Sequence, residues 1–253
     1  MIRQARLFLC ALQFLTRLPT PRVVLEPEAI ARASPYYPVV GWSVGALSAG
    51  ALLLASRLWP GLPAAVIAIA AGMLITGGLH EDGLADTADG LGGGQTRARR
   101  LQIMKDSRVG TYGVLATWAV LSVKAAALSM LKPTEAALAL LLTHGAARSF
   151  PVLVMASLGY AGDPEAAKLK TSIGGARPLE ALAAMALGFA PLALFPSLVR
   201  AGLGLALAAG ATAALALAAR RLIGGFTGDI LGAVEQLAEV GLLLGLAAST
   251  TLR

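Results

Sequence analysis

Long apolar stretches separated by short polar breaks are the feature of this sequence that most restricts its fold. Each is close to the 17 to 25 residues that a helix needs to cross the roughly 30 Å core of a bilayer. The seven segments are residues 39–56, 62–79, 112–131, 136–158, 179–198, 201–219 and 230–252. The last is the weakest, because Glu235 and Glu239 lie in its first half. The pattern predicts an all-α, polytopic membrane helix bundle with about seven transmembrane helices, formed as one domain by residues 1–253.

The composition agrees with a chain whose main partner is the lipid bilayer. Hydrophobic residues make up 57% of the chain and charged residues 14%, with a mean hydropathy of +0.72, whereas soluble domains carry about 25% charged residues. A soluble globule and a disordered chain are therefore excluded. The net charge of +7 is explained by the positive-inside bias of membrane proteins, so no nucleic-acid partner is expected. With Cys10 as the single cysteine, no intrachain disulfide can form.

The N-terminal region differs from the apolar segments that follow it. Residues 2–18 mix aromatic and aliphatic side chains with Arg3, Arg6 and Arg17, which is typical of a helix lying in the plane of the interface. We therefore interpret residues 1–38 as an interfacial N-terminal segment. A first or half-buried span is the alternative. No signal peptide is expected, because no short apolar core is followed by a small-residue cleavage site.

The distribution of basic residues predicts the orientation of the bundle. Alternating seven spans places residues 1–38, 80–111, 159–178 and 220–229 on one side of the membrane, and these segments hold most of the Lys and Arg residues. The basic side is expected to be cytoplasmic. The same side holds nearly all the acidic residues able to do chemistry, so we expect an active site that faces the cytoplasm, with residues 80–111 as its catalytic loop.

The most informative motif is HEDGLADTAD at residues 80–89. Asp82, Asp86 and Asp89 are spaced i, i+4 and i+7, so a helix would stack three carboxylates on one face, with Glu81 beside them. Such carboxylates repel one another and require a cation. Oxygen ligands that leave room for phosphate favour Mg²⁺. The alternative is that these acids only cap and solvate the end of a helix.

Glycines and basic residues follow the acidic motif directly. Gly92 and Gly93 offer flexible backbone amides, and Lys105, Asp106 and Arg108 come shortly afterwards. Beside a metal-binding face, these groups are suited to holding a diphosphate and neutralising the charge that develops as it breaks. The arginines at 97, 99 and 100 fit that role and simple cytoplasmic anchoring equally well.

Two further sets of residues are candidates for binding a substrate. Thr227, Gly228 and Asp229 precede the last apolar segment, where Gly228 permits close approach of an anion and Asp229 either caps a helix or joins the metal site. His144 and Arg148 lie one turn apart inside an apolar segment. Ionisable residues within a membrane span are costly and are functional candidates by default.

These residues lie in blocks that resemble a known family. The blocks are GGLHEDGLADTADGLGGG at 77–94, IMKDSRVGTYG at 103–113 and IGGFTGDILGA at 223–233. They closely resemble the signatures of the cobalamin 5'-phosphate synthase family, the adenosylcobinamide-GDP ribazoletransferases. FLTRLP at 14–19 and YPVVG at 37–41 also resemble that family's N-terminal pattern, so the resemblance covers nearly the whole chain.

The resemblance implies a magnesium-dependent enzyme of the bacterial inner membrane that acts in cobalamin biosynthesis. Such enzymes join adenosylcobinamide-GDP to alpha-ribazole or its 5'-phosphate and release GMP. On this basis Lys105 and Arg108 stabilise the leaving GMP, and His80 or an uncommitted carboxylate takes the proton from the ribazole hydroxyl. The residues assigned to Mg²⁺ are Asp82, Asp86 and Asp89, with Glu81 as an additional candidate.

Three other classes of protein share parts of this pattern. CDP-alcohol phosphotransferases also bind metal through aspartates one helical turn apart, which supports the reaction type but not a shared topology. Membrane prenyltransferases bind magnesium diphosphate between helices. A secondary transporter would use the intramembrane charges as a pathway, but the sequence shows no repeated halves with matched broken helices. The oligomeric state is left open.

Overall fold

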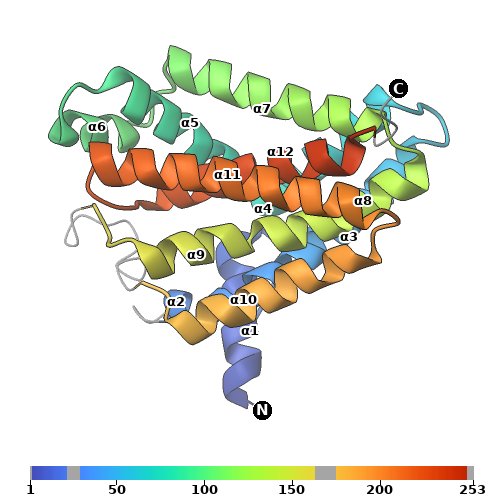
Figure 1. The fold of residues 1–253 in the computed structure, drawn as a ribbon, viewed down its shortest axis with the longest axis horizontal. Coiled ribbons are helices and arrows are strands. Elements are labelled where there is room, and N and C mark those ends of the chain that lie inside the picture. Colours follow the sequence, from blue (N-terminus) through green and yellow to red (C-terminus); the bar gives the residue numbers. More distant parts are fainter. Residues whose placement is uncertain (1, 22–28, 163–174, 250–253) are drawn as a thin grey trace.

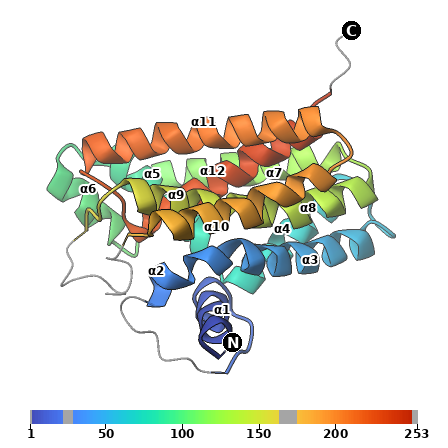
Figure 2. The same cartoon turned by 60° about the horizontal axis from the view of Figure 1, so that its bottom comes forward.

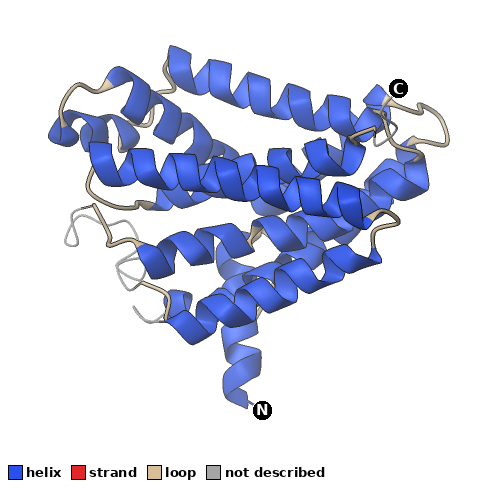
Figure 3. Ribbon diagram, in the orientation of Figure 1, coloured by secondary structure: helices blue, strands red, loops and turns tan. Residues whose placement is uncertain are grey.

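The protein, seen in a computed structural model, is a bundle of helices (Figures 1 and 3). The structure describes residues 2–21, 29–162 and 175–249, and in this part of the chain no strand forms; Tyr160 and Phe226 make one isolated bridge. The predicted all-α class is confirmed. Most long helices run side by side along one direction, as Figures 1 and 2 both show.

Five helical segments of the described chain are long and apolar enough to cross a membrane. A sixth is obtained if α4 (Leu62–Thr76) and α5 (Leu79–Gly93), which are bent by 92° at their junction, count as one span. The five are Ala29–Ala55, which joins α2 (Ala29–Ala33), η1 (Ser34–Tyr36) and α3 (Tyr37–Ala55); α7 (Thr111–Ser129); Pro133–Ser157, which joins α8 (Pro133–Ala147) and α9 (Ser149–Ser157); α11 (Leu198–Leu222); and α12 (Gly228–Ala247). A membrane bundle is thus supported, but the predicted number of seven is not confirmed.

If the bent pair counts as one span, the missing span corresponds to predicted residues 179–198. Here α10 (Pro178–Phe189) gives way to a 3₁₀ helix, η3 (Ala190–Leu194), and the combined apolar helix is too short to qualify. Pro191 lies at the start of η3. A proline lacks the N–H that continues an α-helix and clashes with the preceding turn, which explains why the apolar run is interrupted.

Small residues allow the central helices to pack with their backbones close together. A Cβ on Gly41 of α3 would lie 2.1 Å from the carbonyl oxygen of His144 in α8, and one on Gly245 of α12 would lie 2.0 Å from the amide nitrogen of Gly204 in α11. Side chains at these positions would separate the helices. This is the packing that small residues provide in membrane bundles, where no hydrophobic effect drives helices together.

The N-terminal segment forms a helix that runs across the bundle. α1 (Ile2–Leu15) is roughly perpendicular to the long helices, and its N-terminus points away from them (Figure 1). Cys10, Ala11 and Leu15 are buried and fix its C-terminal half to the core. Its position in the plane of the interface remains a prediction. Parts of the predicted same-side segments, residues 22–28 and 163–174, lie outside the described residues.

Candidate active site

The predicted acidic motif lies on a helix, and two glycines explain where this helix begins. Gly77 and Gly78 have φ angles of 72° and 69°, in the left-handed region that glycine adopts without strain. They end α4 and redirect the chain into α5. Residues 80–111, predicted as a catalytic loop, are therefore mainly helical: α5 is followed by the short helix α6 (Arg97–Met104).

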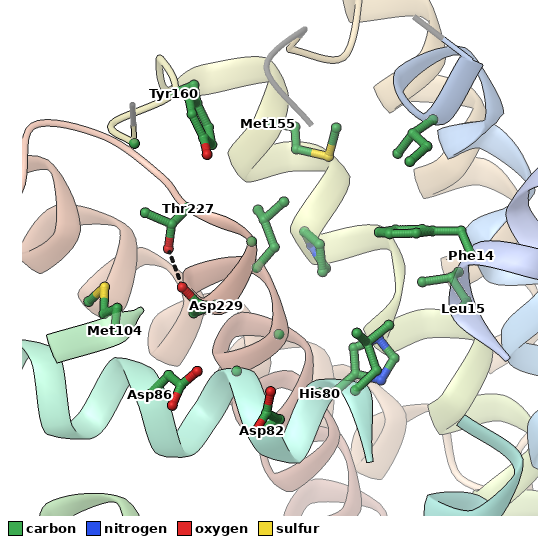
Figure 4. A pocket seen from close by; sticks show the side chains of 18 of the residues that line it. Phe14, Leu15, His80, Asp82, Asp86, Met104, Met155, Tyr160, Thr227 and Asp229 are labelled. Atoms are coloured by element: carbon green, nitrogen blue, oxygen red, sulfur yellow. Dashed lines mark hydrogen bonds between the residues drawn. The ribbon is translucent and has the colours of Figure 1, made fainter. Parts of the chain in front are cut away.

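A cavity of about 360 Å³ lies beside α5. Asp82 and Asp86 of α5 and Asp229 of α12 line it together, and Figure 4 shows the three carboxylates along the same wall. Phe14, Met155 and Tyr160 contribute apolar surface from other elements. All four segments that were predicted to share one side of the membrane thus contribute residues to one cavity.

Asp229 reaches the acidic face because α5 and α12 pack closely. A Cβ on Gly83 would lie 2.9 Å from the carbonyl oxygen of Asp229, and one on Gly232 would lie 3.3 Å from the Cα of Gly83. Thr227 caps α12 by accepting a hydrogen bond from the Ile230 amide at 3.3 Å. Its hydroxyl also lies 3.3 Å from a carboxylate oxygen of Asp229 (Figure 4). Thr227 therefore both caps α12 and contacts the Asp229 carboxylate that lines the cavity.

Several other predicted site residues also reach the cavity. Lys105, which follows α6, lines it, as do His80 of α5, Gly228 at the start of α12 and Arg148 at the junction of α8 and α9. His80 and Arg148 are buried, with 6% and 2% exposure, so the cavity is their main access to a ligand. Positive and negative groups therefore face the same space.

Asp89, predicted as a third metal ligand on α5, has a different position. Its carboxylate oxygens accept hydrogen bonds from the backbone amides of Gly110, at 2.6 Å, and Gly113, at 2.9 Å. These amides begin α7, where a negative charge is favourable. Asp89 does not line the cavity. We therefore interpret it as a residue that fixes α7 to α5 and, through the connecting chain, positions Lys105.

We expect Asp89→Asn to destabilise the protein by about 1–3 kcal/mol, because one of the two glycine amides loses its acceptor. The thermal unfolding midpoint in detergent would fall, and metal affinity measured on the remaining folded protein would be retained. An unchanged midpoint together with lost metal binding would instead identify Asp89 as a metal ligand.

Five other predicted residues, all on α5 or in the segment after α6, lie away from the cavity. Arg108 is exposed and pairs with Asp106 at 2.7 Å, and this hydrogen-bonded guanidinium lowers the pKa of Asp106 to about 2. A Cβ on Gly92 would lie 3.0 Å from the ring of Tyr112, and Gly93 is exposed. Glu81 accepts a hydrogen bond from Gln236 at 3.2 Å and faces a second groove of about 870 Å³ on the other side of Asp82.

Sequence reasoning missed part of the cavity wall. Tyr160 and Met155 carry no motif signal, because a single aromatic or apolar side chain in a largely apolar chain forms no recognisable pattern. Arg97 was assigned only to phosphate binding or anchoring. Instead its Nε donates to the carbonyl of Ile223 at 2.7 Å and its Nη2 donates to the carbonyl of Ala161 at 3.1 Å. It thereby holds together the two loops that form the wall.

The side chains that line the cavity fit magnesium, although the three carboxylates lie too far apart to enclose an ion by themselves. Three carboxylates and no thiolate or second imidazole select a hard cation. Among the described residues, the three carboxylates do not form a group with ligand atoms within 4.8 Å of one another. Magnesium is usually held by one or two carboxylates and completes its shell with water and substrate phosphate, so this spacing suits an ion that arrives with a diphosphate.

Comparison with known proteins shows the family of the chain. A profile of the cobalamin-5-phosphate synthase family matches residues 7–247. The chain belongs to this family. The resemblance drawn from the three sequence blocks is therefore confirmed over nearly the full length.

Three relatives of this cobalamin-5-phosphate synthase family member share the name adenosylcobinamide-GDP ribazoletransferase. The chain is 44% identical to the adenosylcobinamide-GDP ribazoletransferase of Leptothrix cholodnii, with 97% of this chain and 96% of the relative covered. It is 40% identical to that of Azorhizobium caulinodans, with 93% and 92% covered. The enzyme of that name from Shewanella baltica is 38% identical, with 94% and 92% covered. No solved structure matches the chain.

Proposed function

We propose that this chain is an adenosylcobinamide-GDP ribazoletransferase that joins adenosylcobinamide-GDP to alpha-ribazole or its 5'-phosphate. The observation that carries the proposal is the convergence of Asp82, Asp86 and Asp229 on one cavity with Lys105 and Arg148. Carboxylates for a divalent cation beside cations for phosphate oxygens are the parts that diphosphate cleavage needs. The family and the names of the relatives supply the substrates.

We assign Asp82, Asp86 and Asp229 to hold Mg²⁺. When bound, the ion would neutralise the diphosphate and stabilise the charge that develops on the departing phosphate. Asp229 replaces Asp89 in the set inferred from spacing, because Asp229 lines the cavity and Asp89 does not. Lys105 and Arg148 would bind the non-bridging oxygens of the same diphosphate.

The reaction exchanges one phosphorus–oxygen bond for another. The ribazole hydroxyl oxygen attacks the phosphorus nearer the cobinamide, and the bond from this phosphorus to the bridging oxygen breaks. GMP leaves with the bonding electron pair. His80 lines the cavity, and its Nδ1 lies 3.7 Å from Glu235; we assign it to accept the hydroxyl proton, with a cavity carboxylate as the alternative acceptor.

We further propose that the protein lies in the bacterial inner membrane with this cavity open to the cytoplasm. The cavity is lined by parts of the N-terminal region, of α5 and α6, of the chain after α9 and of the start of α12. These regions carry most of the basic residues of the chain. Segments rich in Lys and Arg are retained on the cytoplasmic side of the membrane. Soluble nucleotide substrates would enter from there.

The decisive experiment uses the full chain purified in detergent. We expect it to release GMP from adenosylcobinamide-GDP when alpha-ribazole and Mg²⁺ are both present, and chelation by EDTA to abolish the release. Restoring Mg²⁺ should restore it. Folded protein that releases no GMP would contradict the proposed activity. GMP release that is undiminished in EDTA would contradict the metal requirement.

The same preparation distinguishes the remaining membrane transferases. A prenyltransferase would release pyrophosphate from a prenyl diphosphate, and a CDP-alcohol phosphotransferase would release CMP from a CDP-alcohol. We expect neither product, because both enzymes act on donors other than a guanosine diphosphate ester.

A further inference from the structure

A cluster of ionisable side chains is buried inside the bundle, behind the wall of the cavity. We call Lys124, His144, Arg148, Glu235 and Glu239 the buried charge cluster. Glu235 and Glu239 lie one turn apart on α12 and are 0% and 1% exposed. Lys124 belongs to α7 and His144 to α8, and Arg148 is the residue between α8 and α9. Charges buried to this degree require partners.

The members of the cluster contact one another directly. Nη1 of Arg148 lies 3.0 Å from Oε1 of Glu235 and 3.8 Å from Oε1 of Glu239, and it donates to the carbonyl of His144 at 2.8 Å. Glu239 accepts from Nζ of Lys124, and its Oε1 lies 2.6 Å from Nδ1 of His144. Each carboxylate therefore has a cationic partner.

The cluster contains a group with the spacing of a metal site. Ligand atoms of His144, Glu235 and Glu239 lie within 4.8 Å of one another. However, Lys124 and Arg148 already supply two positive charges to the two carboxylates. A divalent cation would have to enter beside them and would be repelled. The geometry therefore indicates an ion-pair cluster rather than a metal centre.

Arg148 is the cluster member that reaches the cavity; His80, outside the cluster, also lines the cavity and lies 3.7 Å from Glu235. Of the five members, it is the one that lines the 360 Å³ cavity, and its side chain is 2% exposed. Its Nη1 forms an ion pair with Glu235 and donates to the His144 carbonyl, while its Nε has no hydrogen-bond partner in the described chain. A guanidinium has five N–H donors in a rigid fork, so donors remain for a ligand.

We propose that Glu235 is a positioning residue that orients the Arg148 guanidinium so that its remaining donors bind a phosphate oxygen of the nucleotide-linked donor. This inference rests on the proposed function for the identity of the donor. Glu239 supports the same arrangement from the next turn, since it pairs with Lys124 and His144. Glu235 itself touches no substrate; it acts through Arg148.

The test compares Arg148→Lys, Glu235→Gln and the double variant. Loss of the guanidinium fork should raise the KM for adenosylcobinamide-GDP about 100-fold, and Glu235→Gln should raise it about tenfold, while the KM for alpha-ribazole stays within about twofold. In the Arg148→Lys background, Glu235→Gln should add less than about a twofold change, because two residues that act as one unit are not additive.

Two further variants separate positioning from folding. Glu235→Asp keeps the charge but shortens the side chain, and we expect the same selective rise in donor KM from it, which makes it the substitute if the glutamine variant does not fold. Glu135→Gln is the matched control, because Glu135 pairs with Arg200 at 2.6 Å in a partly exposed ion pair that does not line the cavity. It should leave both KM values unchanged.

Equal rises in both KM values, or the same effect of Glu235→Gln in both backgrounds, would overturn the inference. Equilibrium dialysis with adenosylcobinamide-GDP supplies a readout that does not depend on transfer. If the unmodified chain releases no GMP but Arg148→Lys and Glu235→Gln weaken donor binding non-additively, the proposed function fails and the positioning role stands. If GMP is released but donor affinity is unaffected in both variants, the proposed function stands and the positioning role fails.

Discussion

Asp86→Asn is expected to lower the turnover number for GMP release by about 100- to 1,000-fold, which is the usual cost of removing one group that stabilises developing charge. Asp86 lies on the wall of the cavity with Asp82 and Asp229, the other two residues of the proposed cation site. An amide has nearly the same shape as a carboxylate but carries no negative charge. Fold and membrane insertion should therefore be unchanged while the attraction for Mg²⁺ falls.

The measurement is GMP release as a function of Mg²⁺ concentration. We expect the residual activity of Asp86→Asn to require more Mg²⁺ than the unmodified chain. Glu180→Gln is a suitable control, because Glu180 is an acidic residue at the start of α10 that bonds the Arg177 amide and does not line the cavity. Full activity in Asp86→Asn at unchanged Mg²⁺ requirement would remove the acidic face of α5 from the mechanism.

The second large effect concerns stability. Lys124→Met should lower the free energy of unfolding by about 3–5 kcal/mol, since it removes the lysine that pairs with the buried carboxylate of Glu239. Lys124 is 4% exposed, and its Nζ bonds both Glu239 and Gln236. Methionine fills a similar volume, so loss of the charge dominates the change. Unfolding in detergent, followed by circular dichroism, measures it.

A double variant shows whether the cost comes from the unpaired charge. Lys124→Met combined with Glu239→Gln removes both charges of the pair and should recover most of the lost stability, because a buried pair is worth little relative to neutral side chains. Lys132→Met, at an exposed cap of α8, should change the unfolding midpoint little. A double variant as unstable as Lys124→Met alone would show that packing, and not charge, controls the site.

Much of the local structure could be predicted from spacing. Apolar stretches of membrane length predict helices, and the i, i+4 spacing of Asp82 and Asp86 places both on one face of α5, as the structure shows. These inferences succeed because helix periodicity relates residues a few positions apart. The count of spans was less accurate, because Pro191 turns the end of an apolar stretch into a short 3₁₀ segment.

The membership of the site depended on contacts between distant parts of the chain. Asp89 continues the periodic pattern of α5 but is bonded by the amides of Gly110 and Gly113 instead of facing the cavity. Asp229, about 140 residues further along, joins the cavity because Gly83 lets α12 approach α5. The spacing of the acids predicted a face of carboxylates but could not show which of them share one space.

The helices, their apolar faces and the acidic motif thus follow from the amino-acid sequence, since each depends on side chains that are neighbours along a helix. Which charges meet depends on the tertiary structure. Arg148 and Glu235, 3.0 Å apart, come from different helical spans, and no periodicity relates them. Their pairing is set by the packing of α12 against α8 and α9, where a buried charge is stable only beside an opposite one.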